Sequence, residues 1–154
     1  MRRAAFAVVA LAVLVSPMTT EAQQWSPAQE EVWKVVSEMN DRFYSGDIDG
    51  LYEFIDPNVV WWNTGSDVPG DYQGAKKLDT LIASHGRKWL YGTCTPQTIQ
   101  AFDLFAVVNM FCRGLLEAEA GQDPESRTMR GHLVMKREGS SWMLVSNFFD
   151  LTQR

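Results

Sequence analysis

Apolar residues recur every three or four positions in the first part of the chain after residue 25. They are Val32, Val35, Val36, Met39 and Phe43. This spacing predicts an amphipathic helix with one buried face. Ser26, Pro27 and Gln29 predict its start, because serine caps the free amides, proline suits the first turn and glutamine completes a capping box.

A sharp corner between two helices is predicted next, in the stretch SGDIDG. Gly46 ends the first helix, because glycine adopts the left-handed cap conformation without strain. Asp47 is suited to accept hydrogen bonds from the free amides of the following helix. That second helical stretch contains Leu51, Phe54 and Ile55, and Pro57 is expected to end it.

The pattern then changes to β-branched and aromatic residues, which predicts a strand at residues 58–63. A third helix follows, with Leu78, Leu81, Ile82 and His85 on one face and Gly86 at its end. Four further strands are expected near residues 89–101, 105–118, 128–137 and 142–151. Pro96 cannot donate a ladder hydrogen bond, so the first of these four strands should be bulged or lie at an edge there.

Helices first and a meander of strands afterwards predict an α+β fold. We expect a strongly curved, mixed but mostly antiparallel sheet, wrapped by three N-terminal helices into a cone with an interior. The chain has 154 residues, which suits one domain, expected at residues 23–154.

Residues 1–22 have the pattern of a secretory signal peptide. Arg2 and Arg3 precede an apolar run that is too short to cross a bilayer, and small residues end at Ala22. A secreted or periplasmic protein with no membrane segment in its mature form is therefore expected. The formal net charge of -5 and the lack of a basic stripe argue against nucleic acid as a partner.

The chain contains two cysteines, Cys94 and Cys112. An even number in an exported chain favours a disulfide, and two buried free thiols are the alternative. A hairpin turn at Phe102–Leu104 would place the two cysteines opposite each other on neighbouring strands, close enough to form the bond.

The sequence resembles the ketosteroid isomerase and SnoaL-like superfamily, which includes nuclear transport factor two. The resemblance rests on YSGDIDGLYEFIDPNVVWW, YQGAKKLDTLI, FDLFAVVNMF and GSSWMLVSNFFDL, and it covers nearly all of the chain after residue 22. It implies a curved sheet around a deep apolar pocket and a homodimer. The superfamily hosts many activities, so the resemblance is more specific for fold than for function.

The resemblance also implies that the usual catalytic residues are missing. Where steroid isomerases have a tyrosine, a general-base aspartate and a proton-donating aspartate, this chain has Met39, Asn63 and either Gly131 or His132. Asparagine does not abstract protons as aspartate does, which argues against classical steroid isomerisation. Limonene epoxide hydrolase is a second template, and its Asp-Arg-Asp triad corresponds here to Met110, Cys112 and Asn147.

The last predicted hairpin suggests a polar site. A turn centred on Gly139 and Ser140 would place His132 opposite Asn147, on a face shared with Val145 and Phe149. A histidine held by an asparagine beside an apolar cavity suits general acid or base catalysis, because its proton equilibrium lies near neutral pH. The alternative is a structural histidine satisfied by a neighbour, and a shift of one residue in register would move it to the other face.

A ligand site is expected in the pocket, with ordinary core packing as the alternative for its aromatic members. Asn63 and Asn147 would orient a polar group of the ligand or else satisfy each other. The candidate binding residues are Trp61, Asn63, Tyr72, Met110, Val145, Asn147 and Phe149.

Two hypotheses of different classes follow. The first is a non-catalytic pocket that binds a small apolar molecule, or a dimerisation module that binds a partner outside the cytoplasm, and the lack of the tested carboxylates favours it. The second is an acid-base enzyme, an isomerase, cyclase or hydrolase that uses His132 on an apolar or polycyclic substrate. No cofactor is expected, and no metal site either, because His85 and His132 belong to different elements.

Overall fold

The computed structural model describes residues 24–62, 66–118 and 122–151. The expected signal peptide, residues 1–22, lies outside them. Three helices and five strands follow in the order α1 (Pro27–Ser45), α2 (Ile48–Tyr52), β1 (Ile55–Trp62), α3 (Tyr72–His85), β2 (Trp89–Ala101), β3 (Phe105–Leu116), β4 (Glu125–Glu138) and β5 (Ser141–Leu151). Among the described residues, no helix is both long and apolar enough to span a bilayer.

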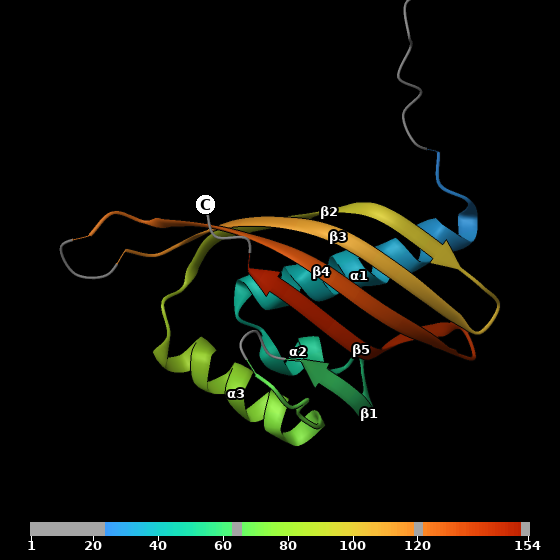
Figure 1. Ribbon diagram of the computed structural model, residues 1–154, viewed down its shortest axis with the longest axis horizontal. Helices are drawn as coiled ribbons and strands as arrows, with labels where there is room; N and C mark the ends of the chain where they lie inside the picture. Colours follow the sequence, from blue (N-terminus) through green and yellow to red (C-terminus); the bar gives the residue numbers. More distant parts are fainter. Residues whose placement is uncertain (1–23, 63–65, 119–121, 152–154) are drawn as a thin grey trace, which may run out of the picture.

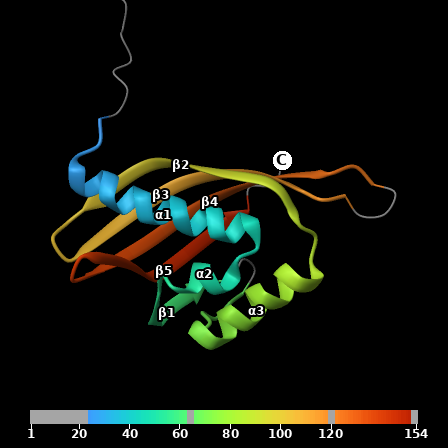
Figure 2. The same ribbon diagram turned by 180° about the vertical axis from the view of Figure 1, so that it is seen from behind.

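The strands form one five-stranded mixed sheet in the order β1-β5-β4-β3-β2. β1 runs parallel to β5, and the other neighbours are antiparallel. Helix α1 crosses one face of the sheet, and α2 and α3 lie together near β1 (Figures 1 and 2). The predicted α+β architecture is therefore confirmed. We call the face toward α1 the inner face and the opposite one the outer face.

The predicted helix corner is present. Ser26 and Gln29 form the capping box of α1, and Gly46 caps its end with a φ of 78°. Asp47 accepts a hydrogen bond from the Gly50 amide at 3.0 Å and so caps α2.

The predicted end of the second helix is wrong. Helix α2 stops at Tyr52, and both Ile55 and Pro57 belong to β1. Ile55 pairs with Leu144 of β5, and the ladder then shifts between Ile55 and Val60. This irregular stretch tolerates Pro57, which has no N–H to contribute.

The apolar face predicted for the third helix is exposed in α3. Leu78, Leu81 and Ile82 are 36%, 55% and 50% exposed, whereas Ala75 and Asp79 are buried. The side of α3 that packs inward is therefore its less apolar one.

The hairpin of β2 and β3 contains the predicted disulfide, with Cys94 paired to Cys112. The register at the turn differs by one residue from the prediction, since Ala101 pairs with Ala106. A bulge between Pro96 and Thr98 shifts the register back, so the cysteines still face each other. Both expectations for Pro96 hold, because β2 is an edge strand and is bulged there.

The core lies between α1 and the inner face of the sheet. Val32, Val36 and Met39 of α1 are buried there. They belong to one apolar cluster with buried residues of the sheet, including Val108, Met110, Leu133, Met135 and Leu144. The helix thus covers the concave side of the strands and leaves a cavity near its C-terminal half.

Candidate ligand-binding cavity

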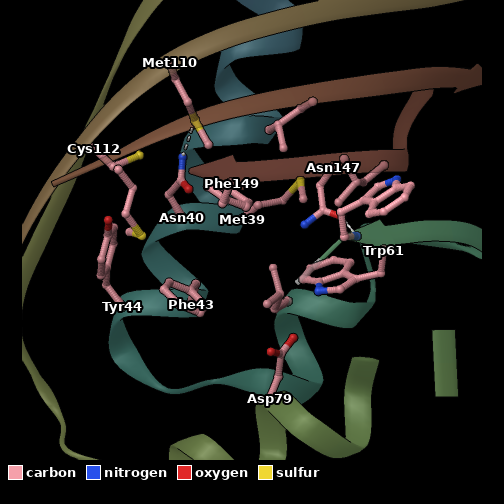
Figure 3. Close-up of a pocket in the computed structure, with 15 residues that line it drawn as sticks. Met39, Asn40, Phe43, Tyr44, Trp61, Asp79, Met110, Cys112, Asn147 and Phe149 are labelled. Atoms are coloured by element: carbon pink, nitrogen blue, oxygen red, sulfur yellow. Dashed lines mark hydrogen bonds between the residues drawn. The ribbon is translucent and has the colours of Figure 1, made fainter. Parts of the chain in front are cut away.

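A cavity of about 180 Å³ lies between α1 and the inner face of the sheet (Figure 3). Every helix and four strands contribute to its lining, which is mostly apolar. The lining residues are Met39, Asn40, Phe43, Tyr44, Leu51, Trp61, Trp62, Asp79, Met110, Cys112, Met129, Leu133, Leu144, Asn147 and Phe149. Such a hollow with few polar groups is typical of small-molecule sites.

Asn147 of β5 is the most deeply buried polar group of this lining, with 1% of its surface exposed. Its Oδ1 accepts a hydrogen bond from the Trp62 backbone N–H at 3.2 Å, which anchors the amide to β1. Its Nδ2 has no hydrogen-bond acceptor among the described residues. An unpaired buried donor costs on the order of 1–3 kcal/mol, so this amide is a strong point of attachment for an acceptor.

Asp79 of α3 brings a carboxylate to the lining, and its side chain is directed toward the cavity (Figure 3). The residue is 8% exposed. The Tyr52 hydroxyl donates a hydrogen bond to its Oδ2 at 2.8 Å. Burial raises the pKa of the Asp79 carboxyl, and the hydrogen bond from Tyr52 offsets part of that rise. Burial and the adjacent Asp79 raise the pKa of Tyr52 as well.

The remaining polar groups of the lining come from the last turns of α1. Asn40 donates a weak hydrogen bond from Nδ2 to the Met110 sulfur at 3.6 Å. The Tyr44 hydroxyl lies 3.8 Å from the sulfur of Cys94, and burial raises the Tyr44 pKa to about 12. The Tyr44 ring packs directly on Gly92, where an added Cβ would lie 2.1 Å from it. Glycine at this position therefore allows the aromatic ring to reach the cavity.

No protein-family model matches the chain, and no curated protein matches its sequence. Solved structures do match it. The ketosteroid isomerase-like protein from Erwinia carotovora atroseptica has a TM-score of 0.67 at 10% identity, over 84% of this chain and 100% of that one. An NTF2-like protein of unknown function in nutrient uptake from Rhodospirillum rubrum has a TM-score of 0.63 at 15% identity, over 79% and 98%. The CaMKII hub of S. rosetta has a TM-score of 0.65 at 20% identity, over 84% and 100%.

The chain has the NTF2-like fold. This confirms the fold implied by the resemblance of the sequence to ketosteroid isomerase and SnoaL-like proteins.

The positions that correspond to catalytic residues of steroid isomerases can be located in this NTF2-like structure. Met39 lines the cavity in place of the tyrosine. A Cβ added to Gly131 would lie 2.8 Å from both Met110 and Phe149, so Gly131 is packed against the inner wall. The third position, Asn63, lies outside the described residues. Met39 and Gly131 carry no acid or base, and His132, the alternative to Gly131, does not line the cavity.

The candidate binding residues separate into two groups in the structure. Trp61, Met110, Asn147 and Phe149 line the cavity. Tyr72 lies behind the wall, where its ring contacts Tyr52 edge-on at 5.2 Å. Val145 is not part of the lining. Trp62 also lines the cavity, although the alternation of side chains along a strand predicts that only one of Trp61 and Trp62 faces inward.

The predicted register of the last hairpin is wrong beyond Met135. Met135 pairs with Leu144 as expected, but the ladder then shifts by one residue, and Val134 pairs with Ser146. Val145 is the additional residue on β5, as in a β-bulge. Asn147 therefore lies opposite Leu133 rather than His132, and Phe148 lies opposite His132.

This shift places His132 on the outer face of the sheet, away from the cavity. It is exposed there and lines an open groove together with Asn109, Arg130 and Phe148. Its Nδ1 lies 2.8 Å from Asn109 Oδ1, and Asn109 in turn donates to Thr98 at 2.8 Å. His132 is thus satisfied by a neighbour on the sheet surface, as the structural alternative expects, and the pairing with Asn147 that suggested catalysis is absent.

Asp79 is the residue that the sequence reasoning missed. The apolar face of Leu78, Leu81 and Ile82 draws attention to the opposite side of α3. A weaker signal was present, because Tyr72, Ala75 and Asp79 recur at helical spacing on the other face. Within the described ranges, no group of three or more His, Cys, Asp or Glu residues is arranged to hold a metal ion.

Proposed function

We propose that this protein binds a small, mostly apolar molecule in the inner cavity, with the Asn147 amide donating a hydrogen bond to an oxygen of that molecule. The observation that carries the proposal is the buried Nδ2 of Asn147, which has no acceptor among the described residues. A carbonyl, ether or hydroxyl oxygen would satisfy it. The Oδ1 atom is already engaged by Trp62, so the orientation of the amide is fixed with its NH₂ group available.

The size of the cavity limits the ligand. A cavity of about 150 Å³ lined by apolar side chains holds benzene, and the cavity here has about 180 Å³. The ligand expected in this cavity is therefore a molecule with one ring or an equivalent aliphatic body, smaller than a steroid. Burial of such a body among Phe43, Trp61 and Phe149 supplies the apolar part of the binding free energy.

The proposal is tested with a pair of isosteric ligands. Acetophenone carries a carbonyl oxygen, and α-methylstyrene has a CH₂ group in its place. Isothermal titration calorimetry should show that the protein prefers acetophenone by about five- to tenfold, the size of one net hydrogen bond. Asn147→Leu should bind both ligands with similar affinity.

A matched control exists on the outer face. Asn109→Leu makes the same substitution at an asparagine that contacts His132 and Thr98 rather than the cavity, so its ligand preference should equal that of the unaltered protein. If the unaltered protein binds neither acetophenone nor α-methylstyrene, the proposal is wrong.

We further propose that the protein works outside the cytoplasm and as a homodimer. The disulfide between Cys94 and Cys112 supports an oxidising compartment, secreted or periplasmic, and agrees with the expected signal peptide. For self-association, the support is the exposed Phe148 on the outer face, together with the CaMKII hub of S. rosetta among the structural neighbours. Sedimentation velocity should show a dimer that Phe148→Glu converts to a monomer.

A further inference from the structure

Asp79 is a buried carboxylate that no cation of the described residues pairs with. Its Oδ2 accepts the hydrogen bond from Tyr52, and its Oδ1 has no hydrogen-bond partner among the described residues. No Lys, Arg or His of the described chain forms an ion pair with it. Lys76, three residues earlier on the same helix, pairs instead with Asp49 at 2.7 Å.

Asp56, the other buried carboxylate among the described residues, has a cation as partner. Its exposed fraction is also small, at 4% against 8% for Asp79. Lys136 contacts its Oδ2 at 2.6 Å, and both the backbone and side-chain nitrogens of Asn58 donate to its Oδ1, at 2.7 and 3.1 Å. These contacts lower the pKa of Asp56. Burial raises the pKa of Asp79, which is consistent with a charge that its own surroundings leave uncompensated.

Aromatic rings adjoin the carboxylate and the cavity that it lines. Phe43, Tyr44 and Trp61 belong to the lining. The Tyr52 ring, whose hydroxyl holds Asp79, is stacked with Trp61 at a centroid distance of 6.1 Å. It already attracts one cation, because Lys76 Nζ lies 5.6 Å from its centroid. The faces of such rings attract ammonium groups, most strongly where water is excluded.

We propose that the ligand of this cavity is a small primary amine in its protonated form, whose ammonium group pairs with Asp79 while its apolar body fills the hollow. The inference rests on the proposed function of the same cavity. An ammonium group supplies the positive charge that no described residue provides for Asp79. The aromatic side chains of the lining suit the CH₂ group and ring next to the ammonium. A carboxylate ligand is repelled, and a neutral ligand leaves the charge of Asp79 unpaired.

The position of Asn147 adds a second requirement. Asn147 and Asp79 project into the cavity from different sides, one from the sheet and one from α3 (Figure 3). A molecule that satisfies both has an ammonium group at one end and an oxygen acceptor at the other. The preferred class is therefore a single-ring or short aliphatic amine that carries a carbonyl, ether or hydroxyl group.

Three ligands with the same ring test the charge preference. Benzylamine, benzyl alcohol and benzoate differ in the group that meets Asp79. Calorimetry at pH 7 should show that benzylamine binds about tenfold or more tightly than benzyl alcohol, the scale expected for a partly desolvated charge pair, and that benzoate binds weakest. Equal binding of benzylamine and benzyl alcohol would overturn the inference without any variant being needed.

Asp79→Asn should remove the preference by weakening benzylamine about tenfold while changing benzyl alcohol by less than about threefold. Asp150→Asn is the matched control, because it removes one carboxylate from the outer groove, and it should leave all three affinities unchanged. An unchanged affinity of Asp79→Asn for benzylamine also contradicts the inference.

The outcomes separate the two proposals. Binding of acetophenone without any preference for benzylamine overturns the amine inference and leaves the cavity proposal standing. Failure of acetophenone, α-methylstyrene, benzylamine and benzyl alcohol alike overturns both. Preference for benzylamine that survives in Asn147→Leu and disappears in Asp79→Asn supports the assignment of the ammonium group to Asp79.

Discussion

Asn147 and His132 lie on neighbouring strands of the same hairpin, yet they face opposite sides of the sheet. Asn147 is buried on the inner face, and its NH₂ group has no acceptor among the described residues. His132 is exposed on the outer face, and Asn109 satisfies it. His132, the more reactive residue type, therefore faces solvent, where its polar group is already hydrogen-bonded. The less reactive amide of Asn147 occupies the buried position that favours ligand binding.

The bulge at Val145 is responsible for this distribution. A regular ladder would place His132 opposite Asn147, and the additional residue moves the pairing by one position. Because side chains alternate along a strand, a shift of one position exchanges the two faces. A single residue on β5 thus determines which polar group of β4 and β5 reaches the cavity.

Substitution of Leu133 should have the largest effect of the changes that test the contrast between the inner and outer faces. Leu133 is the immediate neighbour of His132 in the chain, but it faces inward. It is 2% exposed, pairs with Asn147 and lines the cavity. Leu133→Ala should lower the free energy of unfolding by about 3 kcal/mol, from lost apolar burial and an enlarged hollow. Chemical denaturation measures the change. Leu133→Met, which conserves volume, should cost less than about 1.5 kcal/mol, and equal costs for the two variants would show that Leu133 is not packed as described.

The contribution of Asp79 to the free energy of unfolding should depend on pH, which is a second test of the contrast between the two faces. Burial raises the pKa of its carboxyl in the folded state, so the folded protein holds that proton more tightly than the unfolded chain does. The contribution to stability is complete below pH of about 4, the unfolded pKa, and is lost as the pH rises through the folded pKa. Asp79→Asn removes this loss and keeps an acceptor for Tyr52.

Asp79→Asn should therefore be more stable than the unaltered protein at pH 7, by about 1 kcal/mol, and equally stable below pH of about 4. Denaturation curves between pH 3 and 8 check this. Asp56 should behave in the opposite way, because Lys136 lowers its pKa, and its contribution is lost in acid. If the free energy of unfolding of Asp79→Asn fell between pH 4 and pH 7 by as much as that of the unaltered protein, Asp79 would not be the source of this pH dependence.

His132 should give the smallest effect of the three. It is exposed, and its only described hydrogen bond is the one with Asn109. His132→Ala should change the free energy of unfolding by no more than about 0.5 kcal/mol, as is usual for surface positions. Its affinity for acetophenone should equal that of the unaltered protein, and a marked loss of binding would place His132 at the ligand after all.

Local chemistry predicted much of this fold. The capping box at Ser26, the left-handed Gly46 and the Asp47 cap depend on residues within a few positions of one another, and all three are present. The disulfide pairing was also predicted, although two differences in register at the turn and at the bulge near Pro96 cancel each other.

The candidate site was harder to predict, because it depends on contacts between distant segments. No local signal marks Val145 as a bulge, and without it the hairpin register assigns His132 to the wrong face. Asp79 belongs to a helix whose most apolar face is exposed, so amphipathicity points away from it. Trp61, Met110, Asn147 and Phe149, which the predicted strands and the resemblance suggested, line the cavity. Asp79 beside them depends on the packing of α3, which the sequence pattern does not indicate.

Both edge strands of the sheet, β1 and β2, carry features that disfavour pairing with a strand of another copy. The free side of β2 carries Pro96 and its bulge, which interrupt the row of N–H groups that another chain would need. On the free side of β1, Trp61 and Gly70 exchange both backbone hydrogen bonds, at 3.0 and 2.7 Å, so part of that border is already occupied. Because both edges of the sheet are partly protected against strand addition, the open sheet can leave the cavity accessible to solutes without exposing an edge that promotes aggregation.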